Sequence, residues 1–227
     1  VHDFGARAVA EAARATGAKL THVSAIGANE NSPAAYARSK ARGEKAVQET
    51  ISDAVIFRPS IIFGPEDGFY NRFAAMSRIS PMLPLIGGGE MKFQPVYVAD
   101  VAEAIARSVD GEVEGGRIYE LGGPEAKSFK ACLEEMLSVI DRKRMLVPVP
   151  WWVARLQGRI LGLLPKPLLT VDQVELLRSD NVVSAEAEKE GRTLAGLGIQ
   201  AQAADAILPT YLWQYRPAGQ FTRPNAA

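Results

Sequence analysis

Two side chains in the first part of the chain have the types and the spacing that proton transfer or nucleotide binding requires. Tyr36 and Lys40 lie four residues apart in the run Tyr-Ala-Arg-Ser-Lys, which puts them on one face of a predicted helix, about one turn apart. A nearby ammonium favours the phenolate and lowers the pKa of a tyrosine towards a working acid–base value. The same ammonium can donate a hydrogen bond to a cofactor ribose. The spacing alone is a weak signal, because such pairs also arise by chance.

The residues before this pair strengthen the signal. Ser24 precedes Tyr36 by 12 residues and lies near the end of an apolar segment, 19–26, that is predicted to be a strand. Ligand sites of α/β proteins form at the carboxyl ends of parallel strands, where a serine hydroxyl can bond a substrate oxygen. We therefore predict that Ser24, Tyr36 and Lys40 converge at one edge of a sheet. A purely structural serine is the alternative for Ser24.

The elements that must position these residues alternate between helix and strand. Helices are predicted at 5–16, 34–50, 68–79, 100–109 and 128–140, and strands at 19–26, 54–58, 93–98 and 117–121. Strands separated by helices indicate βαβ units and a parallel sheet, so the fold class is α/β. After about residue 148 the strands give way to helices at 151–164, 170–178 and 203–212, the second of them starting at a capping box of Thr170 and Gln173.

Composition excludes several classes of protein. Lys+Arg and Asp+Glu both number 26, so the formal charge is zero and a nucleic-acid partner is not expected. The single cysteine excludes an internal disulfide, and with two histidines no metal site is predicted. No apolar run reaches the roughly 18 residues that a membrane-spanning helix needs.

Several segments appear in an order that resembles a known superfamily. They are Ser24, Tyr36-x-x-x-Lys40, and the runs 57–65 (FRPSIIFGP), 95–102 (PVYVADVA) and 119–124 (YELGGP). As a set, they resemble the extended and atypical short-chain dehydrogenase/reductase superfamily, near the NAD(P)-dependent epimerase branch. The resemblance covers about residues 1–147. It implies a partial Rossmann-like parallel sheet with a smaller, mostly helical C-terminal region, which divides the chain into 1–147, 148–215 and a loose tail, 216–227.

The same resemblance implies roles for individual residues. Ser24 and Tyr36 would occupy the catalytic positions, and Lys40 would hold the nicotinamide ribose. Residues that would line the nicotinamide pocket are Pro59, Ile61 and Ile62. Asp100 would begin a helix and anchor the turn after a strand.

The C-terminal part resembles a narrower family. Residues 164–181 and 207–213 are similar to the nucleotide-binding accessory subunit of respiratory complex I, and to its bacterial relatives in particular. This resemblance implies a structural, non-catalytic role with NAD(P) as cofactor, NADP(H) being favoured over NAD. The partners would be complex I subunits. The location would be peripheral, on the cytoplasmic face of a bacterial inner membrane or the matrix side of the mitochondrial one. Tyr36 and Lys40 would then be retained cofactor contacts.

One departure from the superfamily concerns its glycine-rich turn, whose backbone N–H groups hold the pyrophosphate. The chain has no G-x-x-G-x-x-G, and Gly87-Gly88-Gly89 is placed late and is interpreted as a loop. We therefore expect either a fragment or a shortened gene product. Tight binding of a dinucleotide by this chain alone is not expected.

A basic segment suggests a second kind of contact. Residues 142–171 contain six basic residues and no acidic one. Within the predicted helix Trp151–Leu164, Arg155 and Arg159 share one face and apolar side chains the other, as in helices that lie in a membrane interface. The alternative is a helix packed on the protein with its arginines in water.

Three hypotheses about function remain. The first is a non-catalytic, nucleotide-binding accessory subunit of respiratory NADH:quinone oxidoreductase. The second is an active NAD(P)-dependent epimerase or reductase that acts on a sugar nucleotide or a small carbonyl compound. The third is a cofactor-free scaffold remnant, which the missing glycine-rich half supports.

Overall fold

The structure is a computed structural model that describes residues 2–163, 165 and 169–218. Helices and strands alternate, as in an α/β fold. In chain order they are α1 (His2–Thr16), β1 (Thr21–Val23), α2 (Ala35–Thr50), β2 (Val55–Pro59), β3 (Ile62–Phe63), α3 (Tyr70–Ile79), β4 (Met82–Ile86), β5 (Lys92–Phe93), β6 (Val96–Tyr97), α4 (Val98–Asp110), β7 (Ile118–Leu121), β8 (Lys127–Ser128), α5 (Phe129–Val139), β9 (Met145–Val149), α6 (Trp151–Leu161), α7 (Val171–Leu176), α8 (Ala185–Lys189) and α9 (Ala204–Leu212). Two 3₁₀ turns, Gly87–Gly89 and Trp213–Tyr215, complete the order. A helix able to span a bilayer is not found within the described part of the chain.

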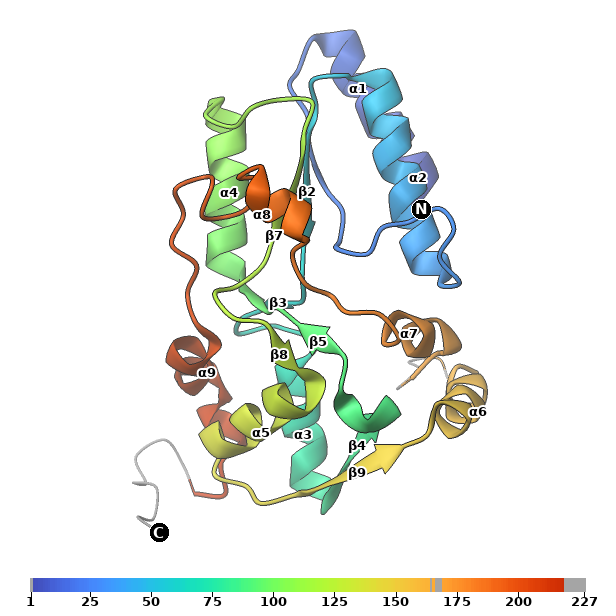
Figure 1. The fold of residues 1–227 in the computed structure, drawn as a ribbon, viewed down its shortest axis with the longest axis vertical. Coiled ribbons are helices and arrows are strands. Elements are labelled where there is room, and N and C mark those ends of the chain that lie inside the picture. Colours follow the sequence, from blue (N-terminus) through green and yellow to red (C-terminus); the bar gives the residue numbers. More distant parts are fainter. Residues whose placement is uncertain (1, 164, 166–168, 219–227) are drawn as a thin grey trace.

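A three-stranded parallel sheet in the order β1-β2-β7 lies in the upper part of the molecule (Figure 1). His22 of β1 pairs with Ile56 of β2, and Phe57 of β2 pairs with Tyr119 of β7. Four of the five residues of the central strand β2 are buried, because helices cover both faces of the sheet. The parallel sheet predicted from the sequence is confirmed.

Helices cover the sheet in two layers. Figure 1 shows α1 and α2 side by side on one face and α4 on the other. Phe57 points to the α4 face and packs with Val101 and Ala104, whereas Ala10 and Val47 pack between α1 and α2 on the opposite side. Alternate residues of β2, Val55 and Phe57, thus supply the core on the α4 side of the sheet.

A second core lies in the lower part of the molecule. Phe69, Phe73, Phe93 and Phe129 form a cluster with ring centroids 5.4–6.0 Å apart, within the range of favourable aromatic contacts. Leu208 of α9 is fully buried in the same core. Segments separated by more than a hundred residues therefore close one apolar core around α3, α5 and α9.

Three features of the strands differ from the sequence prediction. The segment 93–98 forms two short strands rather than one, because Pro95 between them has no N–H for a ladder. β4 is not predicted at all. It pairs in parallel with β9, with Met82 opposite Met145. β9 was not predicted either, and neither were the two-residue strands β3 and β8.

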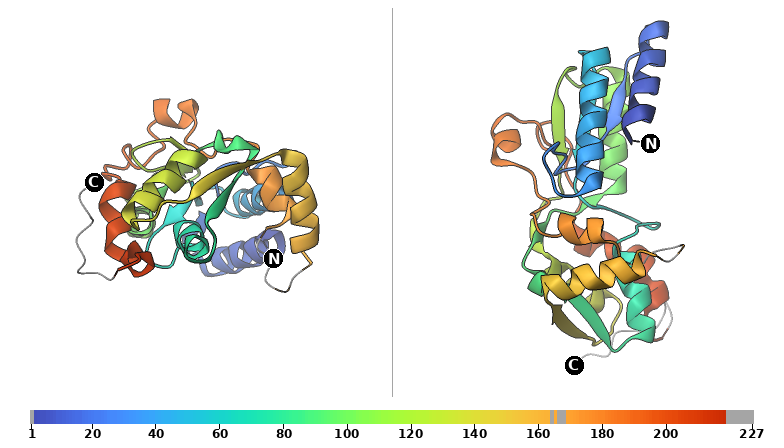
Figure 2. Two further views of the ribbon diagram at one scale, coloured as in Figure 1. Left: turned by 90° about the horizontal axis from the view of Figure 1, so that it is seen from below. Right: turned by 90° about the vertical axis from the view of Figure 1, so that its right-hand side faces the viewer.

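The helices α6 and α7 pack against each other beside β9, in front in the right-hand view of Figure 2. Thr170 and Gln173 form the predicted capping box at the start of α7, which ends two residues earlier than expected. Leu164, the predicted last residue of α6, and residues 219–227 of the predicted tail lie outside the described residues.

Candidate functional site

Ser24 follows the last residue of β1 and is almost fully buried. Its N–H donates to the carbonyl of Phe57 at 2.7 Å, and the N–H of Ile26 donates to the carbonyl of Pro59 at 3.0 Å. The extended pairing with β2 thus continues past the end of β1 and brings Ser24 and Pro59 to the same edge of the sheet. The Ser24 hydroxyl is buried without a hydrogen-bond partner in the structure, which is unusual for a buried polar group.

Helix α2 brings Tyr36 and Lys40 to that edge. The Lys40 ammonium donates a hydrogen bond of 3.0 Å to the carbonyl of Val23, the residue before Ser24. It also lies 5.9 Å from the centre of the Tyr36 ring, as in a cation–π contact. Tyr36 and Lys40 are therefore neighbours, as their spacing predicted. Lys40 also contacts the end of β1.

The N-terminus of α2 is capped from the C-terminal region. The residue before α2, Ala34, offers no side-chain cap. Instead the carboxylate of Asp172, in the first turn of α7, accepts hydrogen bonds from the N–H groups of Ala35 and Tyr36, the latter at 3.1 Å. A carboxylate at this end satisfies free N–H groups and complements the helix dipole. Asp172 therefore fixes the turn that carries Tyr36, which the sequence analysis missed because the two lie 136 residues apart.

The electrostatics differ from the sequence expectation for Tyr36. Burial raises the pKa of the Tyr36 phenol, whereas a catalytic pair was expected to lower it. Lys40 lies over the ring face and bonds Val23, and burial lowers the pKa of its ammonium, against the attraction of Glu44. The expectation of a depressed Tyr36 pKa is therefore wrong for this arrangement, and Tyr36 is a neutral phenol at physiological pH.

The residues implied for the nicotinamide pocket follow the central strand. Pro59 is the buried last residue of β2, and Ile61 and Ile62 are half-buried. Ile61 packs against the lower core, whereas Ile62 packs against the core of the sheet and lines a surface hollow with Val98. These residues thus lie where the two cores of the molecule meet.

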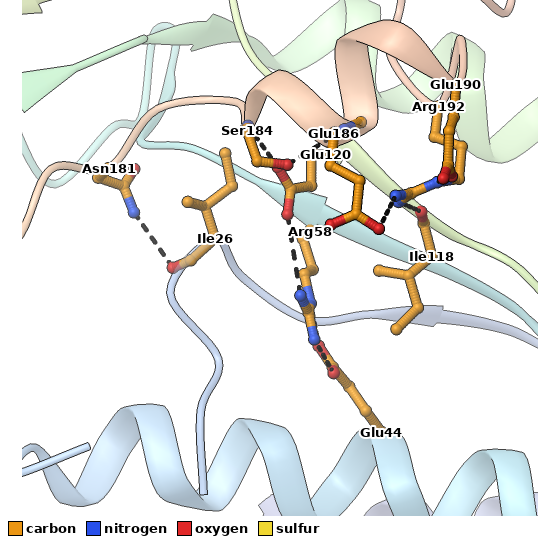
Figure 3. A network of polar contacts seen from close by, with 11 residues as sticks. Ile26, Glu44, Arg58, Ile118, Glu120, Asn181, Ser184, Glu186, Glu190 and Arg192 are labelled. Carbon is orange, nitrogen blue, oxygen red and sulfur yellow. Dashed lines mark hydrogen bonds and ion pairs between the residues drawn. The ribbon is translucent and has the colours of Figure 1, made fainter. Parts of the chain in front are cut away.

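A network of charged groups behind the site was missed by the sequence analysis (Figure 3). The guanidinium of Arg58 donates two hydrogen bonds, of 2.8 and 2.6 Å, to the buried carboxylate of Glu44 and lies 3.8 Å from Glu120. Glu120 in turn accepts from the N–H of Ser184 at 2.7 Å. The network joins α2, the strands β2 and β7, and the start of α8. An arginine inside the apolar strand 54–58 was the available signal, because a buried charge needs a partner.

Asn181 links the C-terminal segment to the same edge of the sheet. Its side-chain amide donates to the carbonyl of Ile26 at 3.2 Å, and its side-chain oxygen lies 2.7 Å from the hydroxyl of Ser60. Asp100 has a comparable role. It lies in the first turn of α4, as expected, and its buried carboxylate accepts the N–H of Gln202 at 2.8 Å. Both contacts hold the C-terminal segment against the sheet.

The family model described as the NAD dependent epimerase/dehydratase family matches residues 5–122, about half of the chain. The chain belongs to this family. The match contains the site residues Ser24, Tyr36 and Lys40, and it ends just after β7. The superfamily resemblance inferred from the sequence is confirmed.

The alignment with one relative extends beyond the segment that the family model matches. The chain is 33% identical over 211 residues to the mitochondrial NADH dehydrogenase [ubiquinone] 1 alpha subcomplex subunit 9 of Arabidopsis thaliana, which covers 88% of this chain and 52% of that protein. It is 44% identical over 102 residues to a ceramide reductase of Caulobacter vibrioides, which covers 45% of this chain and 32% of that protein. The chain thus spans about half the length of the first relative.

Solved structures of the family share the fold. The crystal structure of Thermus thermophilus UDP-glucose 4-epimerase in complex with NAD superposes with a TM-score of 0.64 and 20% identity, over 96% of this chain and 70% of that one. At this level of identity the likeness concerns the fold. The Rossmann-like α/β arrangement predicted for the chain is confirmed.

The polar groups at this edge of the sheet fit the ribose end of a nicotinamide dinucleotide. An ammonium has three N–H donors, and the carbonyl of Val23 takes one of those of Lys40. The Ser24 hydroxyl lies buried at the same edge and has no hydrogen-bond partner in the structure. The donor types and their place at the sheet edge suit a ribose and a carboxamide.

Proposed function

We propose that this chain is part of a nucleotide-binding accessory subunit of respiratory NADH:quinone oxidoreductase, with a structural or assembly role and without catalysis of its own. The observation that carries the proposal is the 33% identity to the alpha subcomplex subunit 9 over 88% of the chain. The family match at residues 5–122 is common to epimerases and reductases. The similarity to the complex I subunit includes the C-terminal region as well.

The geometry of Tyr36 supports a role in binding. Proton transfer by a tyrosine is efficient when its pKa lies near the working pH. Burial raises the pKa of Tyr36 instead. Its ring lies beneath the Lys40 ammonium, which is itself fixed on the carbonyl of Val23. Tyr36 and Lys40 therefore serve as fixed contacts for a bound nucleotide.

In this proposal the nucleotide is NAD(P), with NADP(H) favoured over NAD. When bound, it would supply hydride chemistry that the subunit does not use. Lys40 holds the nicotinamide ribose through its remaining donors, and Ser24 satisfies its hydroxyl on the ligand. Pro59, Ile61 and Ile62 line the nicotinamide pocket.

The proposed location is peripheral, on the cytoplasmic face of a bacterial inner membrane or the matrix side of the mitochondrial one, with complex I subunits as partners. Helix α6, from the predicted segment Trp151–Leu164, supplies one contact with the membrane or the membrane arm. Trp152, Leu156 and Ile160 recur at helical spacing and are each more than half exposed. Arg155, which was predicted to lie on the basic face of this helix, pairs with Glu175 at 2.9 Å, so the apolar stripe contributes more than the charges do.

A second candidate function is an active NAD(P)-dependent reductase. The 44% identity to the ceramide reductase favours it, although that similarity covers 45% of this chain. In this case Tyr36 would act as the acid, and a bound substrate would have to lower its pKa.

Co-purification tests the proposal and separates the two candidates. The gene of the source organism is tagged at the 3′ end, the membranes are solubilised mildly, and the tagged protein is isolated with its partners. Complex I subunits in stoichiometric amount, together with NAD(P) in the extracted small molecules, are the expected result. A protein that migrates alone, without complex I subunits, would overturn the proposal. Reductase activity that a Tyr36→Phe substitution abolishes would then favour the second candidate.

A further inference from the structure

The lower end of the molecule gathers cations around exposed apolar side chains. Helix α3 ends there, and β4 and β9 begin there (Figure 1); the left-hand view of Figure 2 is seen from this side. We call this surface the basic tip. It consists of Arg78, Ile79, Met82, Arg142, Lys143, Arg144 and Met145.

The backbone holds these residues in one place. Met82 and Met145 pair in the parallel ladder of β4 and β9. The Nε of Arg144 donates to the carbonyl of Ser77 at 2.7 Å, and the Nε of Arg142 donates to the carbonyl of Tyr215 at 2.7 Å. Arg144 donates a second bond from Nη1 to the carbonyl of Lys143 at 2.8 Å. Both guanidiniums are thus anchored on backbone carbonyls, so that little conformational entropy remains to be lost when a ligand binds.

The positive charge of the basic tip is not compensated by ion pairs. Among the described residues, no ion pair within 4.0 Å includes Arg78, Arg142, Lys143 or Arg144. Burial lowers the pKa of Arg142, and repulsion from Arg144 and Arg78 lowers it further. Asp141 precedes these residues in the same loop and is exposed. The chain as a whole has a formal charge of zero, so this concentration of cations is local.

Large apolar side chains lie between these cations. Ile79 is 89% exposed, Met145 65% and Met82 50%. Single exposed apolar residues are ordinary on a protein surface. Three of them within a cluster of unpaired cations form a surface that suits a partner with anionic groups outside and hydrocarbon beneath.

We propose that the basic tip binds the surface of an anionic lipid bilayer, with its cations on lipid phosphates and with Ile79, Met82 and Met145 among the headgroups. Basic residues near an anionic membrane gain electrostatic attraction, and apolar side chains gain from transfer into the interface. An acidic protein segment would use the cations alone. The exposure of the three apolar side chains therefore favours the bilayer.

This surface goes beyond the proposed accessory function and does not depend on it. It also differs from helix α6, where Arg155 pairs with Glu175. Binding to lipid vesicles requires neither a nucleotide nor another subunit, so the failure of one proposal would not decide the other.

Vesicle sedimentation of the purified protein tests the inference. The vesicles contain either phosphatidylcholine alone or phosphatidylcholine with phosphatidylglycerol. We expect binding to the anionic vesicles that weakens with salt, and a loss of about tenfold or more in Arg78→Glu with Lys143→Glu. A second variant, Ile79→Ser with Met145→Gln, should also bind more weakly at unchanged charge. The matched control reverses two exposed charges elsewhere, Arg14→Glu with Arg42→Glu, and should bind nearly as the parent does.

Two results would overturn the inference. If both variants of the basic tip bind as the parent does, another surface such as α6 makes the contact, because α6 is unchanged in both. If charge reversal abolishes binding but Ile79→Ser with Met145→Gln does not, and soluble polyglutamate competes fully, the surface recognises acidic protein. Thermal unfolding of each variant, at the same midpoint as the parent, confirms that the fold is intact.

Discussion

The ammonium of Lys40 donates a hydrogen bond of 3.0 Å to the carbonyl of Val23. This bond ties the second turn of α2 to the end of β1, directly before Ser24. It also holds the ammonium over the ring of Tyr36, 5.9 Å from its centre. The spacing of Tyr36 and Lys40 is that of a catalytic pair, and the contacts of Lys40 are those of a fixed binding group.

Replacing Lys40 should weaken nucleotide retention. In Lys40→Ala, one charge-assisted hydrogen bond to the ribose is lost, which corresponds to about 1.5–3 kcal/mol and to a rise of about tenfold or more in the dissociation constant. The measurement is the amount of NAD(P) that co-purifies with the assembled complex. Lys45→Ala is the matched control, because Lys45 lies on the same helix and is exposed. Equal retention in both variants would contradict the role of Lys40.

Replacing the Tyr36 hydroxyl should leave respiration unchanged. Burial raises the pKa of Tyr36, so the hydroxyl is a poor proton-transfer group, and Tyr36→Phe keeps the ring beneath Lys40. We expect the NADH:quinone oxidoreductase activity to stay within about twofold of the parent value. Such a change is small, because about 1.4 kcal/mol corresponds to a tenfold change. A much larger drop, with normal assembly on a native gel, would indicate a working acid at this position.

Breaking the buried ion pair behind the site should destabilise the protein. In Glu44→Gln, the Arg58 guanidinium loses a charged partner that is held by two hydrogen bonds, and removal of one member of a buried pair costs about 3–5 kcal/mol. The control is Glu49→Gln, whose partner Arg7 lies 3.5 Å away on the surface, with an expected effect of about 0–1 kcal/mol. Urea unfolding measures both free energies. Similar midpoints for the two variants would show that the pair is not a source of stability.

Local patterns in the sequence predicted most of the fold. Helices such as α2 and α4 have long apolar periodicities and were predicted within one or two residues of their bounds. The pair β4 and β9 was missed because Met82–Ile86 is a short apolar run with a proline, and its partner strand lies about sixty residues later. Short strands stabilised by distant pairing leave little local signal.

The same distinction holds at the site. Tyr36 and Lys40 could be found because helical spacing places them together. Asp172 and Asn181 could not, because tertiary packing alone brings them to residues more than a hundred positions away. The Tyr36 pKa was predicted in the wrong direction, since spacing tells which groups are near and not how deeply they are buried.

Removing the distant cap of α2 should loosen the site. In Asp172→Ala, the N–H groups of Ala35 and Tyr36 lose their acceptor, and loss of a cap costs about 0.5–2 kcal/mol. Amide hydrogen exchange should increase at the first turn of α2. The exposed residue Glu112 supplies the control, Glu112→Ala, in which exchange there should not change. Unaltered exchange in Asp172→Ala would mean that solvent caps the helix equally well.

The fold should become less stable as the pH falls, because His22 titrates. Burial lowers the pKa of His22 below its ordinary value of 6.5, the Lys40 ammonium lowers it further, and Glu44 opposes both. The folded state therefore binds a proton less readily than the unfolded state. The contribution of His22 is fully present above pH 6.5 and is lost as the pH falls from there towards the folded pKa. Urea unfolding between pH 7.5 and 5 should show a steeper loss of stability in the parent than in His22→Gln, which does not titrate.

In Lys40→Met the repulsion between the ammonium and the His22 ring is absent, so NMR titration of the ring should give a higher His22 pKa than in the parent. Parallel stability curves for the parent and His22→Gln, together with an unshifted ring titration in Lys40→Met, would show that neither burial nor Lys40 controls this group.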